Sequence, residues 1–268
     1  VAEGPAKITA RTIDGAFSSH CFITVGSIVF VSTGGDVFSS GLYANDPKGS
    51  IADGIAVAQS EGRDWVWVAA GTYSVDAQID MVDNISLKGA YSSDFYARDL
   101  ANNDTIIDDT RSSGSTVVFE NLSSVTYLDG FIIQGATATG GVNGIIVSAC
   151  NPVIRNNTIR NRDSASSITK SMHIMQGASP HVYNNVLIGG GSYSSYMIYI
   201  TTNDYAISCE PKIYNNTIML GQGSYRQWGI VFRFDGSPTT FQHPYLKNNI
   251  FYFDNTFAGS STVNHSFY

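Results

Sequence analysis

Hydrophobic and polar residues alternate in four short stretches of the C-terminal half of the chain, and each stretch has the form polar–Pro–x–aliphatic–x–Asn–Asn. The stretches are Asn151–Asn157, Ser179–Asn185, Glu210–Asn216 and His243–Asn249. The motif returns every 28 to 33 residues, at Pro152, Pro180, Pro211 and Pro244. A motif that returns at such an interval indicates a solenoid, in which each repeat stacks on the next.

Each repeat predicts three short strands. Alternation with a period of two is typical of a β-strand, and proline suits the start of a strand rather than its middle. The paired asparagines end this strand, because Asn tolerates left-handed backbone. A second apolar run follows each pair, as in Val186–Ile188. A third run precedes the next proline, and its four examples are Ile145–Val147, Met172–Met175, Met197–Ile200 and Ile230–Phe232.

Three strands per turn of the chain describe an all-β, right-handed, single-stranded parallel β-helix, for which we expect about six to eight coils. Equivalent residues then stack at about 4.8 Å from coil to coil. The inward aliphatic residues form columns, and the Asn pairs form a buried ladder in which each amide bonds to the next. We expect Asp129-Gly130 to replace the Asn pair in an earlier coil.

The N-terminal region predicts a cover for the solenoid. Residues 1–64 contain two β-rich runs, a loop, and a helix over Ile51–Glu61 that Ser50 caps. An open solenoid end exposes strand edges and core, and an amphipathic helix covers both. We expect coils over residues 65–253 and a tail over 254–268. The tail has no obvious cap, so we expect either a truncation there or an oligomer partner at that end.

Two features resemble a known superfamily. The run Gly144-Ile145 … Asn151-Pro152-x-Ile154-x-Asn156-Asn157-x-Ile159 is similar to the repeat of pectate-lyase-like parallel β-helices, and the Asn pairs look like their asparagine ladder. The run Trp65–Tyr73, with a helix before it, is similar to their first coil. The resemblance implies the fold and a cleft on the sheet before each proline. It implies no single reaction, because the superfamily includes lyases, hydrolases, esterases, tailspikes and adhesins.

Composition narrows the class of protein. Charged residues make up 14% of the chain, well under the roughly 25% of ordinary soluble domains, and this favours a secreted or bacterial cell-surface β protein. A net charge of −7 argues against nucleic acid as a partner. No stretch of 18 apolar residues is present, so we expect no membrane span. Of the three cysteines, Cys150 and Cys209 are interpreted as small buried thiols, because two coils separate them. The partner we expect is an extracellular polysaccharide.

The sheet before each proline carries the candidate catalytic residues. His173, Tyr199 and Arg233 could supply the base and the cation that β-elimination from an acidic sugar needs. Asp204 and Asp235 are added as candidate substrate-binding residues and as a weak pair for hydrolysis. The signature motifs of pectate lyases and of inverting polygalacturonases are absent. A core or loop-packing role for His173 and Tyr199 is the alternative.

A second candidate surface lies beside the Asn pairs, where aromatic and basic residues align. Rings contact sugar faces, and Lys and Arg pair with carboxylate or sulfate groups. The alternative is a solvated face on which Tyr serves β propensity. The candidate binding residues of this surface are Arg155, His181, Tyr183, Lys212, Tyr214 and Lys247.

Two functions from different classes fit these observations. The first is an extracellular protein that binds or processes a polysaccharide and that, if it is an enzyme, is a polysaccharide lyase or a glycoside hydrolase. The second is a non-catalytic surface module, such as an adhesin, a spacer or a structural fragment of a larger secreted protein. We expect no cofactor. Ca²⁺ is left open, although no cluster of three carboxylates supports a site for it.

Overall fold

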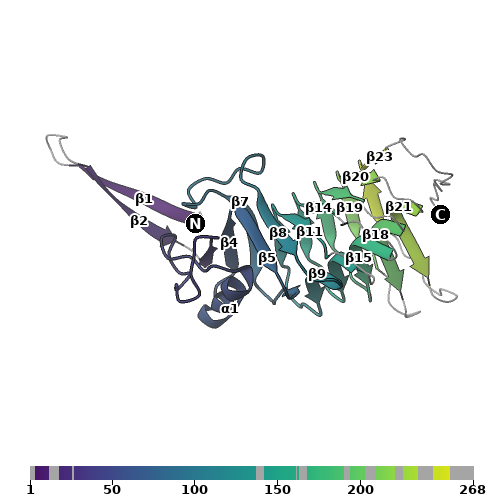
Figure 1. The fold of residues 1–268 in the computed structure, drawn as a ribbon, viewed down its shortest axis with the longest axis horizontal. Helices are drawn as coiled ribbons and strands as arrows, with labels where there is room; N and C mark the ends of the chain where they lie inside the picture. Colours follow the sequence, from purple (N-terminus) through teal and green to yellow (C-terminus); the bar gives the residue numbers. More distant parts are fainter. Residues whose placement is uncertain are drawn as a thin grey trace.

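The computed structural model describes residues 4–11, 18–25, 27–136, 142–160, 162, 168–189, 194–202, 209–220, 226–234 and 244–253. Their strands wind into an elongated right-handed parallel β-helix, so the predicted fold is confirmed (Figure 1). Three parallel sheets run along its length. Six complete coils of three strands are described, from β4–β6 to β19–β21, which lies within the predicted range.

The strand that precedes each Asn pair belongs to an eight-stranded sheet. In the order of their hydrogen bonding, its members are β3 (Ile28–Val31), β4 (Trp65–Ala69), β7 (Ser86–Tyr91), β10 (Tyr127–Asp129), β13 (Val153–Arg155), β16 (His181–Tyr183), β19 (Lys212–Tyr214) and β22 (Tyr245–Lys247).

The strand that follows each Asn pair belongs to a seven-stranded sheet. Its members are β5 (Gly71–Val75), β8 (Thr105–Asp109), β11 (Ile132–Gln134), β14 (Thr158–Arg160), β17 (Val186–Ile188), β20 (Thr217–Leu220) and β23 (Ile250–Phe253).

The third strand of each coil belongs to a six-stranded sheet. Its members are β6 (Ile79–Asp80), β9 (Gly114–Glu120), β12 (Val142–Ser148), β15 (Ile168–Met175), β18 (Ser194–Thr202) and β21 (Arg226–Phe234).

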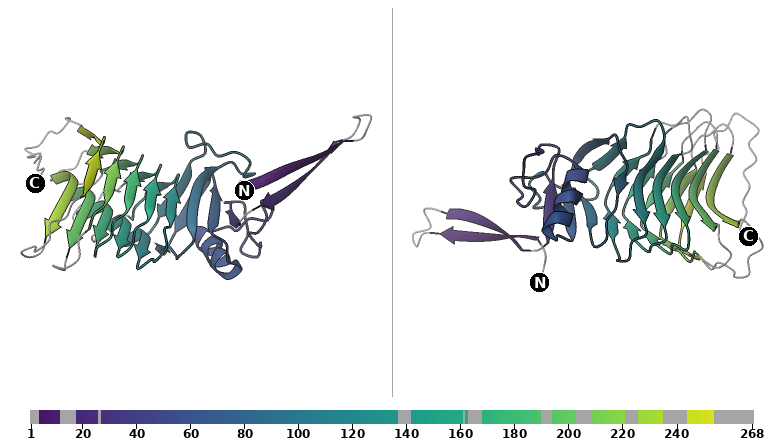
Figure 2. Two further views of the ribbon diagram at one scale, coloured as in Figure 1. Left: turned by 180° about the vertical axis from the view of Figure 1, so that it is seen from behind. Right: turned by 90° about the horizontal axis from the view of Figure 1, so that it is seen from below.

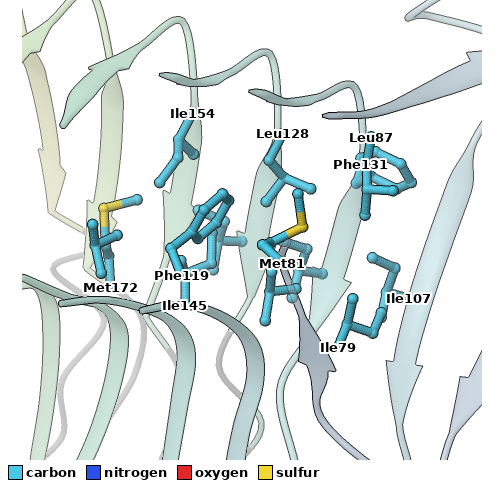
Figure 3. Close-up of a cluster of buried hydrophobic side chains, with 14 of the residues drawn as sticks. Ile79, Met81, Leu87, Ile107, Phe119, Leu128, Phe131, Ile145, Ile154 and Met172 are labelled. Carbon is cyan, nitrogen blue, oxygen red and sulfur yellow. The ribbon is translucent and has the colours of Figure 1, made fainter. Parts of the chain in front are cut away.

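The core is a set of aliphatic columns, as the alternation predicts. Leu128 and Ile154 of the eight-stranded sheet face Ile145 and Met172 of the six-stranded sheet, and all four are fully buried (Figure 3). Each aliphatic side chain removed from water contributes about 1.5–3 kcal/mol. Because their inward side chains meet across the core, these two sheets turn their outer faces to opposite sides of the coil.

The asparagine ladder is built from the second Asn of each pair. The side-chain Nδ2 of Asn157 donates to Oδ1 of Asn185 at 3.1 Å, and Asn185 donates in the same way to Asn216 at 3.0 Å. The first Asn of each pair instead has left-handed backbone, with φ 55° at Asn156. The prediction that both asparagines enter the ladder is therefore wrong, because the bend itself needs one residue with positive φ.

The turn at Asp129 also differs from the prediction. Asp129 pairs in register with Arg155, so Gly130, with φ 85°, occupies the left-handed position of Asn156. Phe131 then stands where the ladder asparagine would be, and its backbone N–H donates to Oδ1 of Asn157 at 3.0 Å. The ladder ends here, because the side chain of Phe131 has no amide that could continue it.

The N-terminal helix α1 (Ile51–Glu61) begins and ends where the sequence predicts. The Ser50 hydroxyl accepts a hydrogen bond from the backbone N–H of Asp53 at 3.1 Å, which is an N-cap. Ile51, Ile55 and Ala58 are buried against the first strands of the eight-stranded sheet. The helix thus covers the N-terminal part of the core.

The second of the two β-rich N-terminal runs divides into two strands that have different partners. Strands β1 (Gly4–Arg11) and β2 (Ser18–Val25) pair with each other in an antiparallel ribbon that projects beyond the coils (Figure 2). Strand β3 instead pairs in parallel with β4, so the parallel sheet begins at Ile28, ahead of the predicted first coil at residue 65.

Two predictions from composition can be compared with the described residues. Cys150 and Cys209 are buried free thiols, as expected, and burial raises the pKa of both. Across the described ranges, no helix has the length and hydrophobicity needed to cross a membrane.

Candidate functional site

The strands of the six-stranded sheet extend further toward the N-terminus than their apolar runs predict. β15 begins at Ile168, β18 at Ser194 and β21 at Arg226, so Arg226 lies on a strand rather than on a loop. The extension places Lys170, Tyr196 and Trp228 in one row across three strands. Sequence reasoning missed these residues because their polar neighbours hide the strand. The sequence carries no alternation signal here, because in Ile168-Thr169-Lys170-Ser171 the apolar residue is exposed and the buried positions are the polar Thr169 and Ser171.

An irregularity in β15 brings two polar side chains to the same face. Ser171 and Met172 are consecutive and both buried, whereas Lys170 and His173 on either side of them are half-buried. The alternation therefore shifts by one residue, and both Lys170 and His173 belong to the outer face of the sheet.

The structure brings the three predicted catalytic residues together. His173 and Tyr199 are directly paired on neighbouring strands, with ring centroids 5.2 Å apart. Arg233 donates from Nη1 to the Tyr199 hydroxyl at 3.4 Å. His173 Nε2 and the Thr201 hydroxyl form a hydrogen bond of 2.9 Å.

Aromatic rings surround these polar groups. Tyr196 and Trp228 are stacked with centroids 4.4 Å apart, and Tyr196 lies 4.8 Å from the ring of Tyr199. The ammonium of Lys170 lies 5.4 Å from the centre of the Tyr199 ring, within the range of a cation–π contact. We call this group the Lys170 cluster, and it consists of Lys170, His173, Tyr196, Tyr199, Trp228 and Arg233.

The electrostatics of the cluster follow from burial. Burial lowers the pKa of the Lys170 ammonium, because it disfavours the charged form. Burial, together with the charge of Lys170, lowers the pKa of His173 to about 4, so the imidazole is neutral at pH 7. Among the described residues, no carboxylate forms an ion pair with Lys170. The cluster thus holds a cation with no described counter-ion.

The remaining candidates for this sheet lie elsewhere. Asp204 and Asp235 fall outside the described residues, so their place near the cluster stays a prediction. In the part of the chain that the structure describes, no three His, Cys, Asp or Glu side chains are grouped closely enough to hold a metal ion.

The second predicted surface is the outer face of the eight-stranded sheet, and its residues have the expected register. Tyr183 is paired with Arg155 on one side and with Tyr214 on the other, and Tyr214 with Lys247. The rings of Tyr183 and Tyr214 are stacked with centroids 4.9 Å apart. His181 pairs with Lys212 in the neighbouring row, and burial and the charge of Lys212 lower the pKa of His181.

Arg155 is already engaged within the protein. Its Nε donates to Oδ2 of the fully buried Asp129 at 2.9 Å, and its Nη1 donates to the Tyr183 hydroxyl at 3.0 Å. Asp129 also pairs with Arg98 at 2.6 Å. Burial alone would raise the pKa of Asp129, but hydrogen bonds from Asn156 and Arg98 and the two arginine charges hold it below its ordinary value. The charge of Arg155 is therefore already paired within the protein, and its guanidinium holds Asp129 and Tyr183 in position.

Comparison with known proteins identifies one family. No curated protein and no solved structure matches the chain, so the resemblance to pectate-lyase-like proteins stays a prediction. A family model described as "Protein of unknown function (DUF1565)" matches residues 33–239. The match spans most of the chain, from the loop before α1 through the six complete coils, and the protein therefore belongs to the DUF1565 family.

Proposed function

We propose that the protein binds an acidic polysaccharide at the Lys170 cluster, on the outer face of the six-stranded sheet. The observation that carries the proposal is the half-buried ammonium of Lys170, which has no carboxylate partner among the described residues. A charge that is partly removed from water without a counter-ion is unfavourable. A carboxylate or sulfate group of a ligand would supply that counter-ion.

The surroundings of Lys170 fit a sugar ligand. The half-buried side chains of Tyr196 and Trp228 provide apolar surface with polar tips, which suits the mixed surface of a pyranose ring, whereas the Tyr199 ring in contact with Tyr196 is itself buried. Arg233 is exposed and brings its guanidinium charge to the Tyr199 hydroxyl, so the cluster carries more than one cation. Charge and aromatic surface together therefore favour an acidic sugar over a neutral sugar or a simple anion.

The finer proposal is β-elimination at this site. Lys170 and Arg233 would neutralise the uronate carboxylate and so acidify the C5 proton. In the tautomer in which Nε2–H donates to Thr201, Nδ1 of His173 would carry the lone pair that takes this proton. The Tyr199 hydroxyl would protonate the leaving oxygen as the C4–O bond breaks and a C4–C5 double bond forms. Each group has a role that its chemistry permits.

One observation favours binding without turnover. A general base works best when its pKa lies near the operating pH, whereas the pKa of His173 is lowered to about 4. A non-catalytic surface module that holds the polysaccharide is therefore the second candidate function, and it uses the same residues.

The test uses the whole chain and a panel of polyuronates and sulfated glycans. Calorimetry measures binding, and absorbance of the unsaturated product measures elimination. Lys170→Met should weaken binding at least tenfold, whereas Arg160→Met, which removes an exposed cation from the seven-stranded sheet, should not. Binding with product supports the lyase, and binding without product supports the surface module. Equal binding by both variants, or no binding to any glycan, would overturn the proposal.

A further inference from the structure

We propose that the outer face of the eight-stranded sheet is a second, separate binding surface, which takes a linear anionic polysaccharide lying along the solenoid axis at one sugar per coil. This surface faces away from the Lys170 cluster, so it goes beyond the function proposed above. We call it the aromatic track, and it consists of Trp65, Tyr127, Arg155, Tyr183 and Tyr214, with Lys212 and Lys247 at its C-terminal end.

The N-terminal half of the track is continuous although one strand contributes no ring to it. Trp65 on β4 and Tyr127 on β10 lie 5.6 Å apart between ring centroids, across the intervening strand β7. Ser86, which pairs with Trp65 on β7, is small enough for the two rings to meet above it, and its hydroxyl accepts from the Tyr127 N–H. The guanidinium carbon of Arg155 then lies 5.5 Å from the centre of the Tyr127 ring.

The C-terminal half continues with the same kind of contact. Arg155 donates to the Tyr183 hydroxyl at 3.0 Å, and the Tyr183 and Tyr214 rings are stacked within 7° of parallel. Each strand from β10 to β19 therefore contributes an aromatic or guanidinium group in contact with the next. Successive strands are about 4.8 Å apart, which is close to the length of one pyranose residue in an extended chain. A linear polysaccharide would meet the same chemistry at every coil.

The charge of the track gives the sign of the ligand. The chain as a whole carries −7, yet Lys212 and Lys247 are exposed here, and no described carboxylate forms an ion pair with either. Asp129, a buried carboxylate beneath the track, is paired with both Arg98 and Arg155, so these three side chains together retain a positive charge. A cationic row on an anionic protein is complementary to a chain of carboxylates or sulfates.

The experiment measures how affinity depends on ligand length. The probes are oligogalacturonates of two to eight residues, titrated against the Lys170→Met protein so that the Lys170 cluster does not contribute. Affinity should rise with each added residue and level off at five to seven, when the ligand spans the track. Lys212→Met with Lys247→Met in the same protein should weaken octamer binding at least tenfold, and Arg160→Met should leave it unchanged.

Three results would overturn this second site. They are affinity that does not depend on ligand length, octamer binding that survives the loss of both lysines, and complete loss of binding in Lys170→Met alone. If only the proposal for the Lys170 cluster is wrong, the outcome is different. The wild-type and Lys170→Met proteins would then bind every oligomer equally, and affinity would still depend on ligand length. Tyr183→Phe, which removes one hydroxyl and keeps the ring stack, should weaken octamer binding two- to fivefold and leave the dimer unaffected.

Discussion

The ammonium of Lys170 lies 5.4 Å from the centre of the Tyr199 ring on the neighbouring strand, beside an imidazole, His173, that burial keeps neutral. Apart from this cation–π contact, no described group of opposite charge compensates the ammonium for the water that it has lost. Structural roles rarely require such an arrangement, since a neutral side chain of the same shape would pack as well. The arrangement is accounted for when a ligand supplies the anion.

Replacing Lys170 by methionine should separate stability from binding. The free energy of unfolding should stay the same or rise by up to about 1 kcal/mol, because a partly buried charge is removed and the apolar stem is kept. Urea denaturation measures this. A loss of more than about 2 kcal/mol would show that Lys170 is a structural residue and would contradict its assignment to a binding site.

His173 should make stability depend on pH below neutrality. Its pKa is about 4 in the folded chain and about 6.5 when unfolded, so between these values the unfolded chain binds a proton that the folded chain does not. Stability is therefore unaffected by this group above about pH 6.5 and falls as the pH drops toward 4, by about 1–3 kcal/mol. His173→Gln should lose this part of the slope. Parallel stability curves for the two proteins would contradict the prediction.

The two asparagines of one pair should respond differently to mutation. Asn185 donates to Asn216 and to the carbonyl of Ile154, and it accepts from the backbone of Asn157. Asn185→Ala should destabilise the chain by about 2–4 kcal/mol, because buried polar groups lose their partners. Asn184 instead has left-handed backbone, with φ 55°. Glycine adopts this conformation freely, so Asn184→Gly should change stability by a few tenths of a kcal/mol. Thermal unfolding of both variants checks the contrast.

Loss of the buried carboxylate of Asp129 should lower the free energy of unfolding more than loss of a partly exposed carboxylate. Asp129→Asn leaves Arg98 and Arg155 without their shared counter-ion, and we expect a loss of about 2–3 kcal/mol, because both arginines keep some access to water. Asp108, which pairs with Arg162 at a partly exposed position, is the matched control. Asp108→Asn should cost at most about 1 kcal/mol. Equal losses in chemical denaturation would contradict this ranking.

Short-range sequence patterns and the repeat were enough to predict the helix and the register of the coils. The Ser50 cap and the apolar spacing of Ile51, Ile55 and Ala58 are short-range features, and in the structure Ser50 caps the helix and these three residues form its buried face. The pairing of Tyr183 with Tyr214 followed from the repeat itself, since equivalent residues of a solenoid must stack. The same reasoning misplaced Asp129 by one position, because a glycine can take the left-handed role of an asparagine.

The candidate site was only half predictable. His173, Tyr199 and Arg233 were predicted as one group from their place on the strands before the prolines, where the resemblance implies a cleft, and they do lie together. Lys170, Tyr196 and Trp228 were not, because the start of each strand is polar and depends on pairing with the coils beside it. The ion pair between Arg155 and Asp129 was likewise not predicted from the sequence. The two residues are 26 positions apart and meet only when one coil lies on the next.

By itself, the sequence determined that this chain is a parallel β-helix and which residues of its proline-containing repeats stack, because the motif imposes one periodicity on those coils. Only the tertiary structure decided which outward cations lie beside a carboxylate of the described residues. Arg155 and Lys170 are both basic residues on outward faces, yet only Arg155 has a described carboxylate beside it. That difference depends on which side chains the winding of the coils brings within a few ångströms, and no periodicity encodes it.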